Sequence, residues 1–399
     1  MKRRLLIVFP ITGLFLSLSS CKKTDSTYTA PTTGNPYAAI QAAFGSEINP
    51  LSWTNYSSQT RPAYIIKDNT GANAIVNGKA TLGRVLFYDK NLSVTNTVSC
   101  GSCHKQAFAF SDTALASAGV LGGVTDRHAM RLINGRFAVE AKFFWDERAA
   151  SLEAQTTQPI AAHNEMGFSG QSGRDNFAAL VTKLQAIGYY KELFTAVYGD
   201  AAITEARMQE CLAQFIRSIQ SFDSKYDSGR AVVANDRNNF PNFTTQENAG
   251  KDLFMTPPIF DANSVRIAGG LGCNACHQAP EFDIDPNSRN NGVIATLSGA
   301  STEFTITRAP SLRDLLNASG NPNGPMMHNG KMKTLEAVIA HYASGIQNNP
   351  NLDGKLRPNG TQIQNLNLQP GELQAIVAFI KTLTGKNVYT DKKWSSPFL

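Results

Sequence analysis

The feature that most constrains this chain is a five-residue pattern, C-x-x-C-H, that occurs twice. The residues are Cys100, Cys103 and His104 in the first copy and Cys273, Cys276 and His277 in the second. Two thiols at this spacing can form thioethers with both vinyl groups of one porphyrin, and the histidine that follows can bind the iron. A structural zinc site usually needs four Cys or His ligands, whereas each copy supplies three. The sequence therefore predicts two covalently attached c-type haems.

The first 38 residues are arranged like the signal peptide and tether of an exported lipoprotein. Three basic residues near the start precede an apolar run over 5–18, and small residues then lead to Cys21. This arrangement is typical of a bacterial signal peptide that ends at a lipid-attachment cysteine. We predict a lipoprotein signal peptide over 1–20, a lipid anchor at Cys21, a flexible tether over 21–38 and a periplasmic location. An ordinary signal peptide with a chance cysteine is the alternative.

The composition is that of a globular protein. Of 399 residues, 42% are hydrophobic and 17% are charged, which excludes a long charged disordered chain. Outside the leader no apolar run is long enough to span a bilayer. The net charge is +6, and three of these positive charges belong to the leader, so no nucleic-acid partner is expected.

Apolar residues recur at helical spacing in three segments. These are Met208, Leu212, Phe215, Ile216, Ile219 and Phe222; Leu335, Val338, Ile339 and Tyr342; and Leu373, Ile376, Val377 and Ile380. The spacing predicts helices joined by long loops, with Cys211 as a buried thiol in the first of them. The separation of the two motifs suggests one haem in each of two domains, over 39–225 and 226–399. Beyond C-x-x-C-H the halves show no convincing sequence repeat.

Further stretches resemble the bacterial di-haem cytochrome c peroxidase/MauG family over most of residues 75–385. They are GRVLFYD (83–89), FWDERA (144–149), SLEAQ (151–155) with Pro159, EMG (165–167), GKDLF (250–254), APSLR (309–313), MHNG (327–330) and TLE (334–336) with Tyr342. The resemblance implies an all-α fold of two cytochrome c-like haem domains, made mostly of helices with long loops.

The resemblance also implies a division of labour between the haems. The N-terminal haem, on His104, would react with hydrogen peroxide. The C-terminal haem, on His277, would pass electrons from a small cytochrome c or a cupredoxin. Family members often form homodimers, although the sequence gives no independent sign of one.

Four residues match the family's catalytic positions. Trp145 would lie between the haems, and Gln155, Pro159 and Glu165 would form the peroxide pocket. Cleavage of the O–O bond needs a group that moves a proton from one oxygen to the other, and Glu165 can do so if a partly apolar pocket raises its pKa. Gln155 can orient the peroxide by hydrogen bonding. Pro159 is expected to end the preceding helix and to leave Glu165 in the loop beyond.

The first departure from the family is in the loop after the first haem motif. Many members have a histidine there that caps the iron, but residues 111–125 contain none. His128 is the nearest, and it aligns better with an asparagine of the family. We therefore predict an open, five-coordinate or water-bound haem at His104. His163 is a second candidate, as a capping ligand or as an aid to proton transfer.

The second departure is at the sixth ligand of the C-terminal haem. Typical peroxidases have a methionine at this position. This chain has Tyr342 there, and MauG also has a tyrosine. Helical spacing turns Tyr342 to the same side as Leu335 and Ile339, and His341 about 100° away. We predict Tyr342 as the ligand, and a tyrosinate should lower the haem potential, whereas methionine raises it. The alternatives are Met326, Met327, Met332, His341 and an open site.

Calcium is left open as a further cofactor. The family often holds Ca²⁺ between the haems with an asparagine side chain and two backbone carbonyls. The carbonyl positions correspond to Asn323 and Pro325. The asparagine position corresponds to His128, which is a poor calcium ligand because Ca²⁺ prefers oxygen, and Asn134 could substitute.

The leading hypothesis is a di-haem cytochrome c peroxidase that reduces hydrogen peroxide to water. The first alternative is a MauG-like oxidase that modifies a partner protein through high-valent haem. Tyr342 and the missing capping histidine favour it, whereas the absence of a tryptophan directly before the second haem motif weakens it. The second alternative is a non-enzymatic di-haem electron carrier.

Overall fold

The computed structural model describes residues 35–139 and 142–399, so the predictions for the signal peptide, Cys21 and most of the tether lie outside the described residues. The α-helices are α1 (Ala38–Phe44), α2 (Asn77–Tyr88), α3 (Cys100–Cys103), α4 (Leu152–Thr156), α5 (Gln158–Ala161), α6 (Phe177–Gln185), α7 (Gly188–Tyr198), α8 (Glu205–Ser218), α9 (Lys225–Arg230), α10 (Thr245–Met255), α11 (Leu335–Ala340) and α12 (Glu372–Lys381). Long loops join them, as predicted. None of the described helices is long and apolar enough to cross a membrane.

Strand structure is limited to short antiparallel pairs in the second half of the chain. Strand β1 (Pro258–Phe260) pairs with β2 (Arg266–Gly269), and β3 (His277–Gln278) pairs with β4 (Asp283–Ile284). The second hairpin begins at the histidine of a haem motif, so it fixes the backbone there.

The three helices that periodicity predicts are α8, α11 and α12. Thr204 caps α8 by accepting a hydrogen bond from the Arg207 N–H, and Thr334 caps α11 in the same way through Ala337. The α-helical pattern of α11 stops at Ala340, where a π-helical turn over His341–Gly345 follows. Such turns are frequent at functional sites, and this one contains Tyr342.

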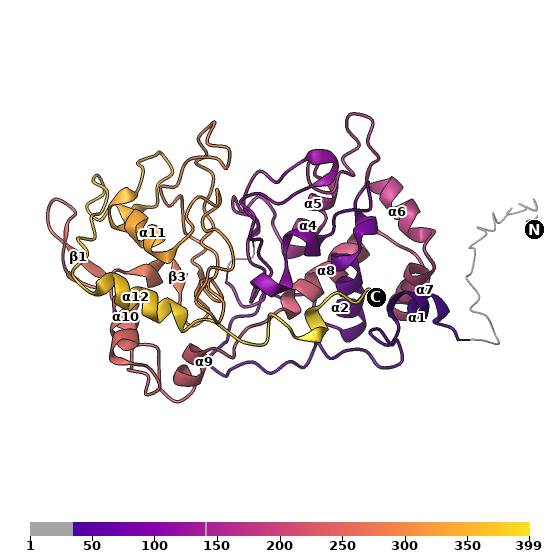
Figure 1. The fold of residues 1–399 in the computed structure, drawn as a ribbon, viewed down its shortest axis with the longest axis horizontal. Helices are drawn as coiled ribbons and strands as arrows, with labels where there is room; N and C mark the ends of the chain where they lie inside the picture. The colour runs from indigo at the N-terminus through magenta and orange to yellow at the C-terminus, as the bar shows by residue number, and fades with distance from the viewer. Residues whose placement is uncertain (1–34, 140–141) are drawn as a thin grey trace, which may run out of the picture.

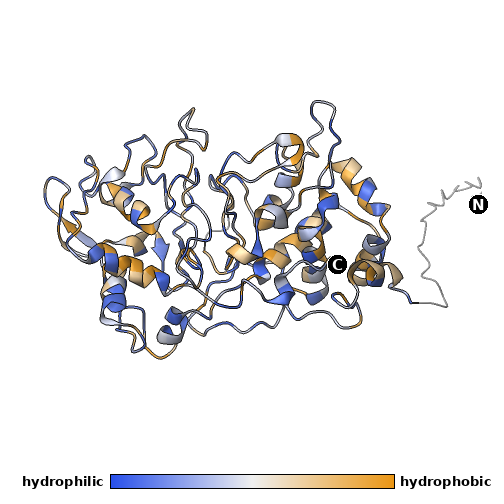
Figure 2. Cartoon of the chain, viewed as in Figure 1, coloured by the Kyte–Doolittle hydropathy of each residue, from blue (hydrophilic) through white to orange (hydrophobic). Residues whose placement is uncertain are grey.

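Two hydrophobic clusters divide the molecule into two lobes (Figure 1). The first contains residues from Ile40 to Ile219, and the second contains residues from Tyr226 to Leu383. The C-terminal segment returns to the first lobe, where Trp394 is buried and its carbonyl accepts a hydrogen bond from the Tyr88 hydroxyl (2.6 Å). The helices of both lobes carry apolar and polar residues side by side along the chain (Figure 2), as helices with one buried face do.

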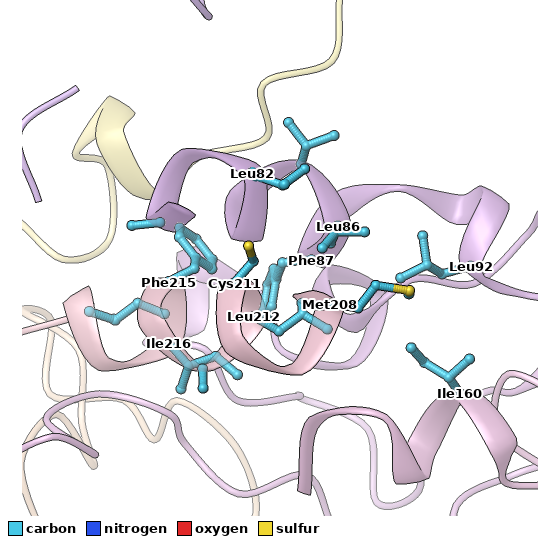
Figure 3. Packing of buried hydrophobic residues seen from close by; sticks show 14 of the residues in the cluster. Leu82, Leu86, Phe87, Leu92, Ile160, Met208, Cys211, Leu212, Phe215 and Ile216 are labelled. Atoms are coloured by element: carbon cyan, nitrogen blue, oxygen red, sulfur yellow. The ribbon is translucent and has the colours of Figure 1, made fainter. Parts of the chain in front are cut away.

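Each lobe is built around one close crossing of two helices. In the first, α2 crosses α8 at Gly83, where a Cβ atom would lie far inside van der Waals contact with the Cys211 carbonyl. The phenyl rings of Phe87 and Phe215 meet there with centroids 5.2 Å apart (Figure 3). Cys211 is fully buried in this contact, as predicted.

The second lobe repeats the crossing with α10 and α12. A Cβ at Gly250 would meet the Ala375 carbonyl, and the rings of Phe254 and Phe379 lie 5.3 Å apart. The two halves, whose sequences show no convincing repeat beyond C-x-x-C-H, therefore share this crossing in the structure. The shared unit is a glycine that lets two backbones touch and a phenylalanine four residues later that packs on the partner helix.

Candidate functional site

The first C-x-x-C-H motif forms the short helix α3 and the turn after it. Ser99 and Ser102 make a capping box at its start. The Nδ1 of His104 lies 3.1 Å from the Phe110 carbonyl. A carbonyl only accepts, so Nδ1 carries the proton and Nε2 keeps a lone pair for a metal. Burial lowers the pKa of His104, and the carbonyls of Phe110 and Met130 oppose this shift.

The second motif borders a large, mainly apolar cavity. Its lining includes Cys273, Cys276, His277, Leu335, Ile339, Tyr342 and Trp145. Burial lowers the pKa of His277 to about 4, and the carbonyl of Pro310 opposes the shift. The His277 Nδ1 is buried without a hydrogen-bond partner. Thus each motif histidine is neutral and has a backbone carbonyl beside it, from Met130 in one lobe and Pro310 in the other.

This donor set fits a covalently bound porphyrin. The four motif cysteines form no disulfide and remain available for thioether bonds. An apolar cavity with a neutral imidazole in its wall matches the flat apolar ring and the iron of a haem. When bound, the haem supplies an iron centre that binds peroxide and exchanges electrons.

The predicted proton carrier, Glu165, lies beside the first motif. Burial raises the pKa of Glu165 to about 7, Arg148 opposes the shift and Asp126 adds to it. Burial also raises the pKa of Cys103 to about 11, a Ser117 hydrogen bond opposes this, and the Glu165 charge adds to it. The carboxyl group is therefore close enough to the motif to act on it electrostatically, and it exchanges protons near neutral pH.

Backbone hydrogen bonds fix the loop that carries Glu165. The Val120 N–H donates to the Glu165 carbonyl (2.9 Å), and the Val94 N–H donates to the Met166 carbonyl (3.0 Å). Gly119 lets the 111–125 loop approach so closely that a Cβ there would collide with the Asn164 carbonyl. The loop that lacks a capping histidine thus supports the loop that contains Glu165.

Gln155 and Pro159 lie on two short consecutive helices. Gln155 is half-buried on α4, which Ser151 caps. The prediction that Pro159 ends this helix is wrong, because α4 stops at Thr156 and Pro159 lies in the first turn of α5. Proline is tolerated there because first-turn N–H groups have no intrahelical partner. The Pro159 carbonyl accepts a hydrogen bond from Met166 (3.3 Å), next to Glu165.

Trp145 lies where the two lobes meet. It is buried in the wall of the cavity beside His277, and its Nε1 donates to the His128 carbonyl (2.9 Å). The Thr307 N–H, from the second half of the chain, donates to the Trp145 carbonyl (3.0 Å). Met130, two residues after His128, has its carbonyl beside His104. The segment 128–131 therefore runs from one motif to the other.

Both histidines considered as capping ligands have protein partners. His128 is buried, and its Nδ1 lies 3.1 Å from the Ala114 carbonyl. The Nδ1 of His163 lies 2.9 Å from the Ser169 hydroxyl. These contacts hold each ring in place, which is consistent with the predicted open haem at His104.

The candidates for the sixth ligand separate into two groups. Tyr342, Met326 and Met327 line the cavity. The Asn291 amide donates to the Tyr342 hydroxyl (3.1 Å) and lies 3.4 Å from the Met327 sulfur. His341 instead places its Nε2 2.9 Å from the Asn291 carbonyl. Burial raises the pKa of Tyr342, and the hydrogen bond from Asn291 opposes this shift.

The asparagines considered for calcium already make hydrogen bonds within the protein. The Asn134 side chain bonds the backbone of Ser221 through both its oxygen and its nitrogen. Asn323 donates to the Asp314 carbonyl and to the Tyr389 hydroxyl, and its side-chain oxygen is buried without a partner. Among the described residues no group of three or more His, Cys, Asp or Glu side chains is arranged to hold a metal ion.

Comparisons with known proteins agree with this geometry. A sequence profile of di-haem cytochrome c peroxidases matches residues 77–234. Residues 77–234 thus belong to the di-haem cytochrome c peroxidase family, and relatives named MauG and cytochrome c peroxidase match more than three quarters of the chain. Family membership means that it is an oxidoreductase with two iron-containing c-type haems.

Similar members of the di-haem peroxidase/MauG family have different names. The methylamine utilization protein MauG of Methylorubrum extorquens is 29% identical, over 78% of this chain and 80% of that protein. The cytochrome c551 peroxidase of Nitrosomonas europaea is 26% identical, over 81% and 84%. A crystal structure of a MauG-like protein associated with microbial copper homeostasis is 26% identical with a TM-score of 0.64, and the match covers 87% of this chain and 99% of that one.

Three features of this family member are not evident from its sequence. Phe110 contacts His104 through its carbonyl because Ala109 and Phe110 both have left-handed backbone angles (φ +54° and +59°). No glycine marks this turn, so no sequence signal reveals it. Asn291 lies in a loop without periodicity. Arg131 lines the cavity beside His277, and only its charge within an apolar stretch could have indicated a position there.

Proposed function

We propose that this protein is an exported di-haem peroxidase that reduces hydrogen peroxide to water. Each peroxide takes up two electrons and two protons and gives two molecules of water. A small cytochrome c or a cupredoxin supplies the electrons. The proposal rests on the position and the pKa of Glu165. This carboxyl group lies beside the first motif and exchanges a proton near neutral pH, and O–O cleavage needs such a group.

Glu165 and Gln155 act on the peroxide in this proposal. The Glu165 carboxylate accepts the proton of one peroxide oxygen and returns it to the other, which leaves as water. Gln155 orients the peroxide by hydrogen bonding. The backbone bonds that fix Glu165 keep its carboxyl group in place, so little reorganisation accompanies the transfer.

Trp145 connects the two sites. Its indole lies in the cavity wall beside His277, and segment 128–131 leads from it to His104. An oxidisable ring held by a hydrogen bond between two redox sites can relay electrons between them. His277 and Tyr342 would hold the iron of the haem that receives electrons from the donor.

Substitution Glu165→Gln tests the proposal. The amide keeps the shape of the side chain but cannot carry a proton. We therefore expect the ferric protein to react with peroxide at least about 100-fold more slowly. Glu336→Gln, at an exposed position of α11, is the matched control and should leave the rate unchanged. Equal rates for Glu165→Gln and the unaltered protein would contradict the assignment.

A MauG-like oxidation of a partner protein is the second candidate function. Tyr342 in the cavity wall favours it, since a tyrosinate stabilises oxidised iron. The two functions differ in what reduces the peroxide-treated protein. Rapid catalytic reduction by a small cytochrome c or a cupredoxin supports the peroxidase. Long-lived oxidising equivalents that such donors do not remove support the oxidase, and no peroxide reaction at all supports an electron carrier.

We also propose export through residues 1–20, a lipid anchor at Cys21 in the periplasm and two haem domains over 39–225 and 226–399. The lipobox-like order of the leader supports the anchor. Replacing Cys21 by serine should release the protein from the membrane fraction, and retention of the variant there would contradict the anchor.

A further inference from the structure

Arg131 is a half-buried arginine that has no carboxylate partner within ion-pair distance in the described part of the chain. One guanidinium nitrogen donates to the Ser311 carbonyl (2.9 Å), whereas its Nε is buried without a partner. Asp314 acts on it only from beyond ion-pair distance, and burial raises the pKa of that carboxyl group. A charge in such a place without a counter-ion is unfavourable, because little water reaches it to solvate it.

The four buried arginines of the described chain all have such partners. The pairs are Arg84 with Glu47 (3.5 Å), Arg313 with Asp227 (3.0 Å), Arg217 with Glu153 and Arg266 with Glu372. Arg131 differs from them in one further respect, because its side chain lines the cavity beside His277. The missing anion is therefore expected in the cavity.

We propose that Arg131 binds a propionate group of the second haem. A haem carries two carboxylates, and a guanidinium can bind a carboxylate through two parallel hydrogen bonds. The free Nε of Arg131 is one of the donors that such a bond uses. Arg131 and His277 line the same cavity, which identifies the haem concerned.

The other cations of the cavity wall are less suited to this role. Lys355 is paired with Asp285 (2.7 Å) and lies 3.7 Å from Asp353. Arg289 is exposed, so water already solvates its charge. Arg308 donates to the Lys142 carbonyl and lies over the Phe143 ring. Arg131 is thus the cation of the cavity wall that gains most from a carboxylate in the cavity.

A fixed positive charge next to a propionate also favours the reduced form of the iron. Arg131 therefore opposes the lowering of potential that a tyrosinate ligand at Tyr342 would cause. The positive charge makes the second haem easier to reduce, which is what entry of electrons from a donor requires.

The test compares Arg131→Gln, Arg131→Lys and Arg289→Gln in the holoprotein, with haem content as the check on folding. We expect Arg131→Gln to shift the resonance Raman propionate bending band of one haem and to lower the reduction potential of that haem. Arg131→Lys should shift the band but largely keep the potential, because the charge remains. Arg289→Gln should change neither.

Three outcomes overturn the proposal. One is an unchanged band and potential in Arg131→Gln. Another is a shift in Arg289→Gln without one in Arg131→Gln. The third is an unchanged band in Arg131→Lys, which decides the matter if Arg131→Gln does not fold. These readouts do not depend on peroxide turnover, so the proposed function can fail while this inference stands, and the reverse also holds.

Discussion

The buried surroundings of the Glu165 carboxyl group determine the pH range in which it can accept a proton. Burial raises its pKa from 4.5 to about 7. Only the deprotonated form accepts the first proton of peroxide. The rate of the peroxide reaction should therefore rise as pH increases through about 7 and level off above it. Stopped-flow rates between pH 5 and 9 measure this.

The same titration should disappear in Glu165→Gln, because an amide has no proton to lose. A rate profile that keeps its midpoint near 7 in that variant would mean that another group controls the proton transfer.

The Asn291 side-chain amide contacts both Tyr342 and Met327. Substitutions can show which of these two residues is the sixth ligand. If Tyr342 is the sixth ligand, Tyr342→Phe should convert the low-spin haem to high-spin and raise its potential, as EPR and potentiometry would show. Met327→Leu should leave the low-spin signal in place. The opposite pair of results would identify Met327 as the ligand.

Sequence predicts the residues of the two motifs because covalent chemistry dictates their spacing. It does not predict the groups that orient them. Phe110 reaches His104 only through two consecutive left-handed residues that are not glycine, and Asn291 comes from a loop without periodicity. Both depend on tertiary contacts that no local pattern encodes.

The helix crossing is the element on which each lobe depends. An alanine at Gly83 or Gly250 would force the two backbones apart, so each substitution should lower the free energy of unfolding by about 2 kcal/mol or more. Urea unfolding of the ferric protein measures this. Gly354 has no atom near its would-be Cβ, so Gly354→Ala should stay within about 0.5 kcal/mol. Equal midpoints for all three variants would contradict the role of the crossings.

Periodicity predicts the helices α8, α11 and α12 because each buries one face. The repeat of the crossing is hard to find in the sequence, since the shared pattern G-x-x-L-F, at 83–87 and 250–254, is short and lies at different distances from the two haem motifs. The sequence also predicts the wrong helix position for Pro159. A proline can follow the end of one helix or lie in the first turn of the next, and the sequence alone does not distinguish the two.

At the scale of the molecule, the cavity beside His277 is a property of both lobes. Its wall includes Trp145 and Arg131 from the first half of the chain, and the C-terminal segment with Trp394 returns to the first lobe. Residues from both lobes therefore form the wall of one cavity. The resemblance to a family predicts Trp145 between the two haem sites, whereas periodicity and composition predict no contact between the halves, because they report on single elements.

The central claim is that peroxide reacts at an open haem on His104 without prior reduction of the protein. The most direct test is an optical and EPR spectrum of the ferric protein before and after one equivalent of hydrogen peroxide. The account predicts one high-spin and one low-spin haem, and immediate loss of the high-spin signal. Two low-spin haems that stay inert until one is reduced would contradict it and would make His128 or His163 a capping ligand.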